Sequence, residues 1–151
     1  MAKGINETCF LDAGFKGKAT TKGFEGQIVV QSLSYSIAQS GEFEESSARN
    51  ARITSFAPAV IAKDMDQASP SIYKACAEKK HIPKVTITFV DGQNKEYFKI
   101  VLEDCIIRSV SAGFHSGEAK PTETVSLDYR KAEWRRGTEV ASYDLKQNVG
   151  A

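Results

Sequence analysis

The chain has 151 residues, of which 41% are hydrophobic and 26% are charged, and its formal net charge is +1 at pH 7. These values are typical of a globular protein with an apolar core, and we predict a single domain over residues 1–151. Twenty basic residues are balanced by nineteen acidic ones, so binding of nucleic acid through a basic face is not expected.

Short strand-like runs dominate the first part of the chain. Thr8–Phe15 predicts a first strand, and Gln27–Ala38, rich in β-branched and aromatic residues, predicts a second. Ser40–Asn50 is polar and predicts a long loop. Arg52–Ile61 predicts a further strand that Pro58 interrupts, which is typical of a sheet edge or a bulge.

One helix is predicted near the middle of the chain. Ser69 provides an N-cap hydroxyl, and Pro70 occupies the first helical position, where its missing N–H costs nothing. Pro83 prevents the helix from extending much beyond His81. A helix of two to three turns needs to pack on a sheet to be stable. Its buried face is expected from the three-to-four spacing of Ile72, Tyr73, Cys76 and Ala77.

Alternating apolar and polar residues mark two long strands of the second half. Val85–Phe89 alternates and is followed by a turn at Asp91-Gly92. Phe98–Ala112 alternates over a greater length, with a kink or bulge expected at Glu103-Asp104. Both patterns indicate strands with one face toward a core.

The remaining strands lead to a prediction of the fold. Val125–Tyr129 alternates, and a turn at Arg136-Gly137 leads into a last strand within Val140–Val149. Many short strands with a single helix indicate an antiparallel barrel or a two-sheet sandwich. We therefore predict a mainly β fold: an antiparallel, two-sheet β-barrel with one flanking α-helix.

No catalytic group is predicted. Cys76 and His81 lie close in sequence, and a Cys–His pair can form a reactive thiolate. However, Cys76 is placed on the apolar side of the helix, and the helix dipole explains a basic His81 at its C-terminal end. We therefore favour a structural role for both residues. The neighbouring carboxylates of Glu103 and Asp104 point to opposite faces of a strand and do not form an acid–base pair.

No metal or cofactor site is predicted either. The only two histidines, His81 and His115, do not have the spacing of zinc ligands. The cysteines form no CxxC pair and are odd in number, so we expect them to be small core residues without a disulfide framework: Cys9, Cys76 and Cys105.

The segment Met1–Glu7 lacks a basic stretch followed by an apolar run, so no signal peptide is expected. No apolar run approaches the length of about 20 residues that a membrane-spanning helix needs. We expect a protein that folds in the cytoplasm and that leaves the cell, if it does so, by a route that reads no N-terminal signal.

Several motifs resemble, in their order and spacing, those of the Hcp family, which forms the tube of type VI secretion. Lys63–Cys76 is similar to the family motif K-x-x-D-x-(A/S)-(S/T)-P-x-(L/I)-x-x-A. The segments His81–Pro83, Val110–Gly113 and Glu123–Tyr129 follow in the family's order. Leu33-Ser34-Tyr35 stands where an aromatic–Ser–aromatic triplet is common. The resemblance extends over nearly the whole chain.

The resemblance implies a homo-hexameric ring of β-barrels whose copies stack into a tube. It also implies partners: a contractile sheath, a baseplate, a spike of the VgrG type and effector proteins held in the ring lumen. Ser34 is the implied effector contact in the lumen, with an ordinary solvent-facing serine as the alternative. The implied ring-stacking loop, which is otherwise a simple surface loop, begins with Ser40, Gly41, Glu42, Phe43, Glu44 and Glu45.

Two further expectations follow. Lys79 stands where the family often has the glycine that ends its helix, which disfavours a left-handed C-cap at that position. The alternative function is a non-catalytic β-barrel of lipocalin type that binds a small ligand in its interior. A toxin fused to a tube domain is disfavoured because the predicted barrel takes up the whole chain.

Overall fold

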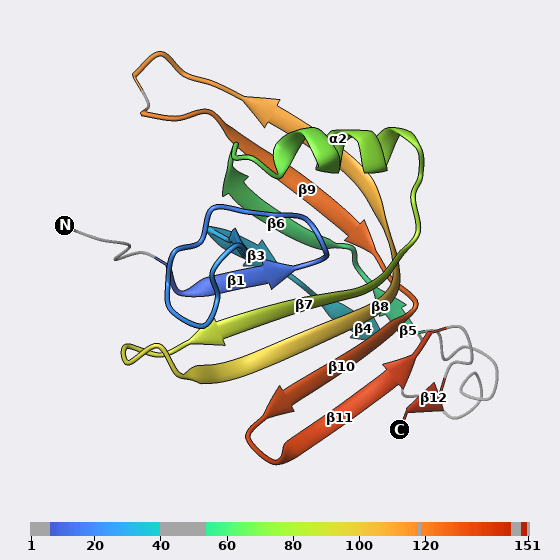
Figure 1. Cartoon of the computed structure of the whole chain (residues 1–151). Coiled ribbons are helices and arrows are strands. Elements are labelled where there is room, and N and C mark those ends of the chain that lie inside the picture. The colour runs from blue at the N-terminus through green and yellow to red at the C-terminus, as the bar shows by residue number, and fades with distance from the viewer. Residues whose placement is uncertain (1–6, 40–53, 118, 146–148, 151) are drawn as a thin grey trace.

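The structure is a computed structural model that describes residues 7–39, 54–117, 119–145 and 149–150. In this part of the chain there are twelve strands and one helix, and all the strand pairs are antiparallel. Figure 1 shows two sheets that meet along the long strand β8 (Glu96–Gly113). The predicted mainly β fold with one helix is thus confirmed.

The first sheet is built on the β7–β8 hairpin. In sheet order its strands are β12 (Val149–Gly150), β11 (Glu139–Asp144), β10 (Lys131–Arg136), β8, β7 (Ile82–Val90), β1 (Cys9–Asp12) and β2 (Ile28–Val29). The predicted alternation is seen in β7 and β8, where Ile87 lies opposite Ile100 and both are buried. The predicted turn between β10 and β11 contains Gly137 with a φ of 64°, a conformation that glycine adopts readily.

The second sheet shares only the later half of β8. Its order is β3 (Ser32–Ser34), β6 (Ala59–Asp64), β9 (Thr122–Asp128) and β8. In β6 and β9 buried and half-buried residues alternate strictly, so one face of this sheet is turned toward the core and the other away from it.

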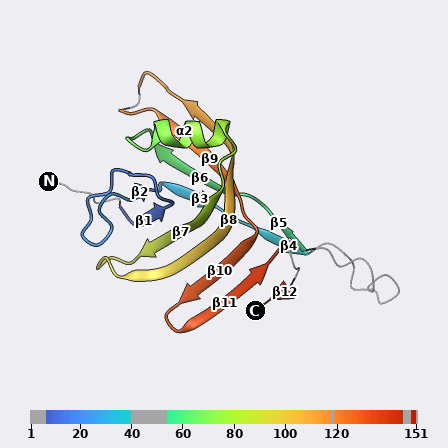
Figure 2. The same ribbon diagram turned by 45° about the vertical axis from the view of Figure 1, so that its right-hand side comes forward.

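Two bent segments join the sheets into a barrel-like wall (Figure 2). Strand β8 changes sheets near Asp104, whose φ of 60° agrees with the predicted kink. The β-bulge of this strand lies further along, where its register against β9 shifts between Ile107 and Ser109. On the other side, the Val30 N–H donates to Cys9 O in one sheet and the Gln31 N–H donates to Ala62 O in the other. The enclosed core includes the fully buried side chains of Ile61, Val85, Ile87, Leu102 and Cys105.

Helix α2 (Ser69–Ala77) packs against β8, and Pro70 lies in its first turn, one position later than predicted. The predicted N-cap is wrong: the cap is Ala68, without a side-chain cap bond. The Ser69 hydroxyl instead accepts a hydrogen bond from the Asp66 N–H at 3.0 Å. This bond closes a turn before the helix, so the hydroxyl is not available to the first helical N–H groups.

The buried face of α2 is narrower than predicted. Ile72 is buried as expected, together with Ala75, and Cys76 is half-buried. Tyr73 and Ala77 are exposed, because one side of the helix faces solvent. Three-to-four spacing thus identified the helix but not the limits of its buried stripe.

The helix ends in a left-handed residue, contrary to the prediction. Lys79 has a φ of 54°. Its N–H donates to Cys76 O at 3.1 Å, and the Lys80 N–H donates to Ala75 O at 2.9 Å. These two bonds form a Schellman motif, which satisfies carbonyls at the helix end and offsets the steric cost of a non-glycine residue.

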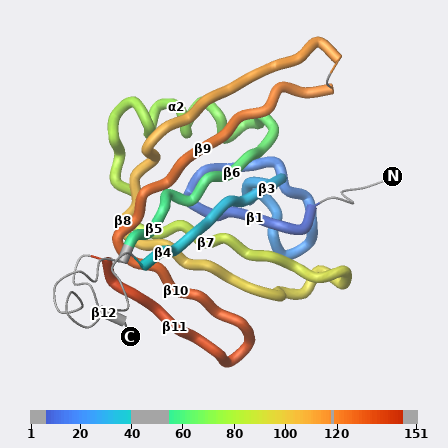
Figure 3. The backbone as a smooth tube through the Cα atoms, turned by 180° about the vertical axis from the view of Figure 1, so that it is seen from behind, coloured from blue at the N-terminus to red at the C-terminus, as the bar shows by residue number. Residues whose placement is uncertain are grey.

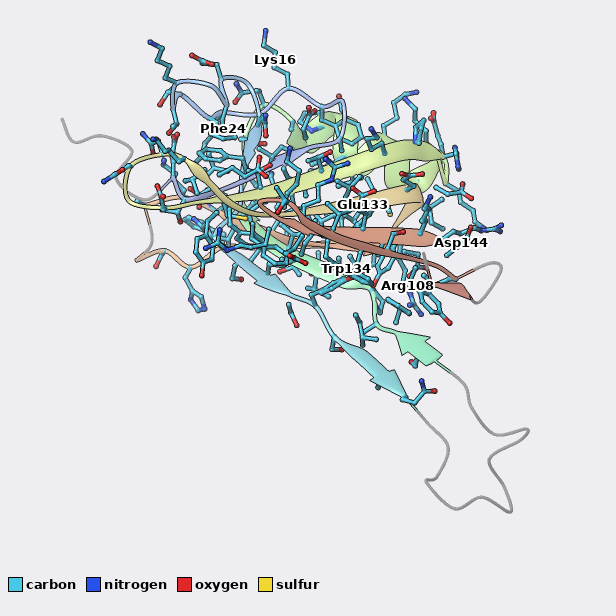
Figure 4. All side chains as sticks on the ribbon, turned by 90° about the horizontal axis from the view of Figure 1, so that it is seen from below. Lys16, Phe24, Arg108, Glu133, Trp134 and Asp144 are labelled. Atoms are coloured by element: carbon cyan, nitrogen blue, oxygen red, sulfur yellow. The ribbon has the colours of Figure 1, made fainter. Side chains whose placement is uncertain are left out.

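The first half of the chain contains shorter and more numerous strands than predicted. The segment expected as one strand, Gln27–Ala38, contains β2, β3 and the start of β4 (Ile37–Gln39), because the chain changes sheets within it. Pro58 separates β5 (Thr54–Phe56) from β6. Strands β4 and β5 pair with each other and project from the body of the molecule (Figure 4).

Candidate functional site

The outward side of the second sheet presents a surface of small polar residues. Ser32 and Ser34 of β3 are exposed, whereas Leu33 between them packs against the core. The same alternation in β9 directs Thr124 and Ser126 outward. We call this surface the hydroxyl face, and its hydroxyl residues are Ser32, Ser34, Ser109, Ser111, Thr122, Thr124 and Ser126.

Strand register places these residues in rows across four strands. One row runs through Ser34, Val60, Ser126 and Ser109, and the next runs through Ser32, Ala62, Thr124 and Ser111. Directly opposed residues of antiparallel strands lie on the same face of the sheet. Figure 3 shows β3, β6 and β9 side by side on this face, with α2 on the other side of the sheet.

Charged residues lie beyond the two rows, at the ends of strands β6 and β9. Asp64 accepts hydrogen bonds from Lys18 Nζ and Gln31 Nε2, each at 2.7 Å. Burial opposes ionisation of Asp64, but these bonds outweigh it and lower the pKa of its carboxyl group. At the opposite end Asp128 lies 3.5 Å from Arg108. The middle of the face is therefore uncharged, and its acidic ends are paired with basic side chains.

An ionic cluster lies beneath the face, on the core side of β6 and β9. Lys63 and Glu123 are 1% and 2% exposed, and they form a direct ion pair. The ammonium group of Lys63 also donates to Asp64 O at 2.9 Å and to Asp66 Oδ1 at 3.0 Å. All three ammonium hydrogens therefore have an acceptor, which is the condition under which a buried charge is tolerated.

The cluster joins α2 to the second sheet. Ser69 Oγ donates to Glu123 Oε2 at 2.7 Å, and the Tyr73 hydroxyl donates to Glu123 Oε1 at 2.6 Å. Burial raises the pKa of Glu123, but bonds from Lys63, Tyr73 and Ser69 outweigh it, so the net pKa is lowered. The Glu123 bond in turn raises the pKa of Tyr73 to about 12. The helix is thus fixed to the sheet through charge as well as apolar contact.

The interior of the barrel is filled by side chains. A cavity of about 20 Å³ lies among apolar residues that include Leu11, Ile28 and Ile107. Pockets for small organic ligands have volumes of about 300–1,000 Å³, so this cavity is far too small for one. The interior geometry therefore argues against the alternative prediction of a ligand-binding barrel.

The structure places the predicted site residues as follows. Ser34 is exposed on the hydroxyl face, and its contact with effectors stays a prediction. The predicted stacking residues lie outside the described residues: Ser40, Gly41, Glu42, Phe43, Glu44 and Glu45.

The two residues weighed as a reactive pair have separate environments. The ring of His81 contacts the carboxylate of Asp104. Cys76 lies on α2 beside a surface groove that Val110 and Ala112 of β8 also line. Among the described residues, no group of three or more His, Cys, Asp or Glu side chains is arranged to hold a metal ion, and no helix could span a membrane.

Sequence reasoning missed most of the hydroxyl face and the whole ionic cluster. The rows depend on register between strands that are far apart in the chain. Lys63 and Glu123 are sixty residues apart and look like surface residues by type. One signal was available: in the strict alternation of β9, Glu123 falls on the same side as Val125 and Leu127.

Comparison with known proteins gives consistent results. A family model described as "Type VI secretion system effector, Hcp" matches residues 10–135. "Protein hcp1" of Pseudomonas aeruginosa is 33% identical over 59% of this chain and 64% of its own length, which is just under two thirds. The "Major exported protein" of the same organism is 30% identical over 78% of this chain and 73% of its own length.

The fold agrees as well. The crystal structure of Hcp1 from Salmonella typhimurium is 29% identical to this chain, with a TM-score of 0.82 over 95% of this chain and 98% of that one. The match extends over nearly the whole chain, in agreement with the family's motifs found along the sequence. The chain therefore belongs to the Hcp family of type VI secretion system proteins.

Proposed function

We propose that this chain is a non-catalytic tube subunit that forms a homo-hexameric ring, and that these rings stack into a tube. The observation that supports the proposal most is the family match over residues 10–135, since it includes α2, the whole second sheet and the central strands of the first. A head-to-tail contact repeated around six copies closes into a ring. The near-neutral net charge of +1 leaves little repulsion between copies.

In this proposal the hydroxyl face lines the ring lumen, and Ser34 contacts effector proteins there. Serine and threonine hydroxyls both donate and accept hydrogen bonds, so they suit cargo of varied sequence. Their small side chains keep the wall flat, and the uncharged middle of the face does not attract strongly charged segments. The loop over residues 40–50 makes the contact between stacked rings.

The remaining partners follow from the same role. The tube is surrounded by a contractile sheath, starts at a baseplate and ends in a spike of the VgrG type. The chain folds in the cytoplasm as a single domain over residues 1–151 and leaves the cell through type VI secretion. Its work is assembly, so it requires no reactive group and no cofactor.

Sizing chromatography with light scattering tests the ring. The purified chain is expected to have a mass near that of six chains, and negative-stain images are expected to show rings with a central hole. A monomer at high concentration would contradict the proposal. Deleting residues 41–50 is expected to leave the rings intact and to abolish export of the chain by host cells. Undiminished export would exclude the loop from stacking.

A gold label tests which surface lines the lumen. In a Cys76→Ser background, a maleimide gold cluster is coupled to Ser126→Cys on the hydroxyl face. Ser71→Cys on α2, which lies on the other side of the sheet, is the matched control. We expect gold in the central hole only for Ser126→Cys. Gold at the outer rim for this variant would show that the hydroxyl face does not line the lumen.

A further inference from the structure

Within the part of the chain that the structure describes, the β4–β5 hairpin is not joined to either sheet. Among the described residues its strands pair only with each other, with Ile37 opposite Phe56 and Gln39 opposite Thr54. All of β4 is exposed, and Ile37 retains 47% of its accessible surface. An isolated two-stranded hairpin is at best marginally stable in water. The direction of this hairpin must therefore be set where it joins the barrel.

Phe56, the last residue of β5, is at the centre of that junction. Its ring centroid lies 5.4 Å from that of Tyr143, 6.1 Å from that of Tyr129 and 6.4 Å from that of Trp134. The Trp134 ring is nearly parallel to it, at 11°, and the Tyr129 ring is nearly perpendicular, at 89°. These separations and angles are those of favourable aromatic pairs.

The other strand is held at the same point. Tyr35, two residues before β4, accepts a hydrogen bond from Trp134 Nε1–H at 2.9 Å, and its ring centroid is 6.1 Å from that of Tyr129. The Tyr129 hydroxyl donates to Ala57 O, just after β5, at 2.9 Å. Figure 4 shows Trp134 near the place where the hairpin leaves the body of the molecule.

We call this cluster the aromatic socket; its residues are Tyr35, Phe56, Tyr129, Trp134 and Tyr143. It joins the β4–β5 hairpin to the β10–β11 hairpin, which belongs to a different sheet. Both strands of the hairpin are held where they join the barrel. Tyr35, before β4, is held by its hydrogen bond with Trp134, and Phe56 of β5 is held by ring packing. Such a junction restricts rotation of the hairpin relative to the barrel.

We propose that the aromatic socket holds the β4–β5 hairpin in one direction and so positions it for the contact between stacked rings. This inference rests on the proposed function, because stacking is the step that needs a fixed direction. A hairpin free to rotate would have to be ordered at each ring contact, and this cost would weaken association. The five aromatic residues are therefore positioning residues for assembly, although none of them needs to touch the next ring.

Trp134 is the single tryptophan of the chain, so its fluorescence reports on the socket. We compare Phe56→Ala with Phe114→Ala, a matched change at an exposed phenylalanine (62%) just after β8. For Phe56→Ala we expect red-shifted Trp134 emission, stronger quenching by acrylamide and an unchanged ring mass. Export by host cells is expected to fall roughly tenfold, because the hairpin must then be ordered each time two rings associate. Phe114→Ala is expected to behave like the wild type.

Phe56→Leu, which retains an apolar side chain, provides the same readouts if Phe56→Ala does not fold. Wild-type emission in both Phe56 variants, or shifted emission with wild-type export, would overturn the inference. If the wild-type chain forms no rings and is not exported, the proposed function fails, whereas the emission measurements still decide whether the socket holds the hairpin.

The hydrogen bond inside the socket supplies an independent test. Tyr35→Phe and Trp134→Phe each remove one partner of the bond and keep an aromatic ring. If the bond acts in positioning, each variant is expected to reduce export severalfold, and the double variant is expected to be no worse than the more impaired single one. Additive losses in the double variant would show that the two side chains act separately.

Discussion

Lys63 is an unusual residue for a core, because a charged side chain loses several kcal/mol of hydration when it is buried. Here it is accommodated by three acceptors, of which Glu123 lies across the sheet on β9 and Asp66 lies just before α2. The cluster specifies which part of α2 meets which part of the sheet. Apolar packing alone would allow the helix to slide by a turn.

Removal of the Lys63 charge is expected to leave Glu123 buried and unpaired. We predict that Lys63→Met lowers the free energy of unfolding by about 3–5 kcal/mol, the usual effect of breaking a buried pair. Urea denaturation measures this loss. The matched control is Lys74→Met, which removes a pair whose lysine side chain is 74% exposed, and it is expected to change stability by less than about 0.5 kcal/mol. Equal losses in both variants would contradict the role of the cluster.

The ionic cluster also predicts a dependence of stability on pH. Because the pKa of Glu123 is lowered in the folded state, ionised Glu123 stabilises the fold above its ordinary pKa of 4.5. This contribution is lost as the pH falls through the folded-state pKa. Thermal melting between about pH 7 and pH 3 is expected to show a smaller decline for Glu123→Gln than for the wild type. Glu139→Gln, on the exposed end of β11, is the control and should keep the wild-type decline.

The three thiols are expected to differ in reactivity. Burial raises the pKa of both Cys9 and Cys105 to about 12, so neither forms much thiolate near neutral pH. Cys76 is only half-buried. Iodoacetamide at about pH 8 is expected to modify Cys76 first in the folded protein, as measured by mass spectrometry of peptides. Modification of Cys105 at the same rate would show that the core opens far more often than its packing implies.

At the scale of elements, hydrophobic alternation was a good guide where a strand stays in one sheet. It identified β7, β9 and the two halves of β8, including the kink at Asp104. It failed for residues 27–38, because a chain that passes from one sheet to the other keeps its β-forming composition but not its pairing. Strand β10 was missed because its alternation has only two inward apolar residues, Ala132 and Trp134.

The site was less predictable than the fold for a similar reason. Resemblance indicated Ser34, and alternation in β9 indicated which residues point outward. The rows of the hydroxyl face arise only when β3, β6, β9 and β8 are in register, and no local pattern contains that information. The direction of the Ser69 hydroxyl depends on distant residues too, because it donates to Glu123, fifty-four residues away.

The helix C-terminus offers a test at this scale. A lysine in the left-handed conformation costs roughly 1–2 kcal/mol, and glycine avoids most of that cost but loses more backbone entropy on folding. We predict that Lys79→Gly stabilises the protein by about 0.5–1 kcal/mol, measured by urea denaturation. Lys80→Gly is the matched control, since Lys80 is not left-handed, and it should give no gain. A loss of stability in Lys79→Gly would mean that the Lys79 side chain makes a contact that stabilises the fold by more than the backbone strain costs.

At the scale of the whole molecule, the proposed assembly should affect the melting temperature. If the proposed rings form and dissociate before or during unfolding, the melting temperature rises with protein concentration, because association stabilises only the folded chain. We predict such a rise over a hundredfold range of concentration, on the order of a few degrees, by differential scanning fluorimetry. A constant melting temperature would indicate a chain that unfolds as a monomer.

The position of β8 in both sheets has a consequence for how the chain unfolds. Its earlier half is hydrogen-bonded to β7 and β10 and its later half to β9, so both sheets lose a member if it is withdrawn. Neither sheet can therefore melt while the other survives as a native-like remnant. Slow hydrogen exchange should give one common opening free energy for β7 and β9, and a subunit damaged in either sheet is lost as a whole instead of persisting half-folded within an assembly.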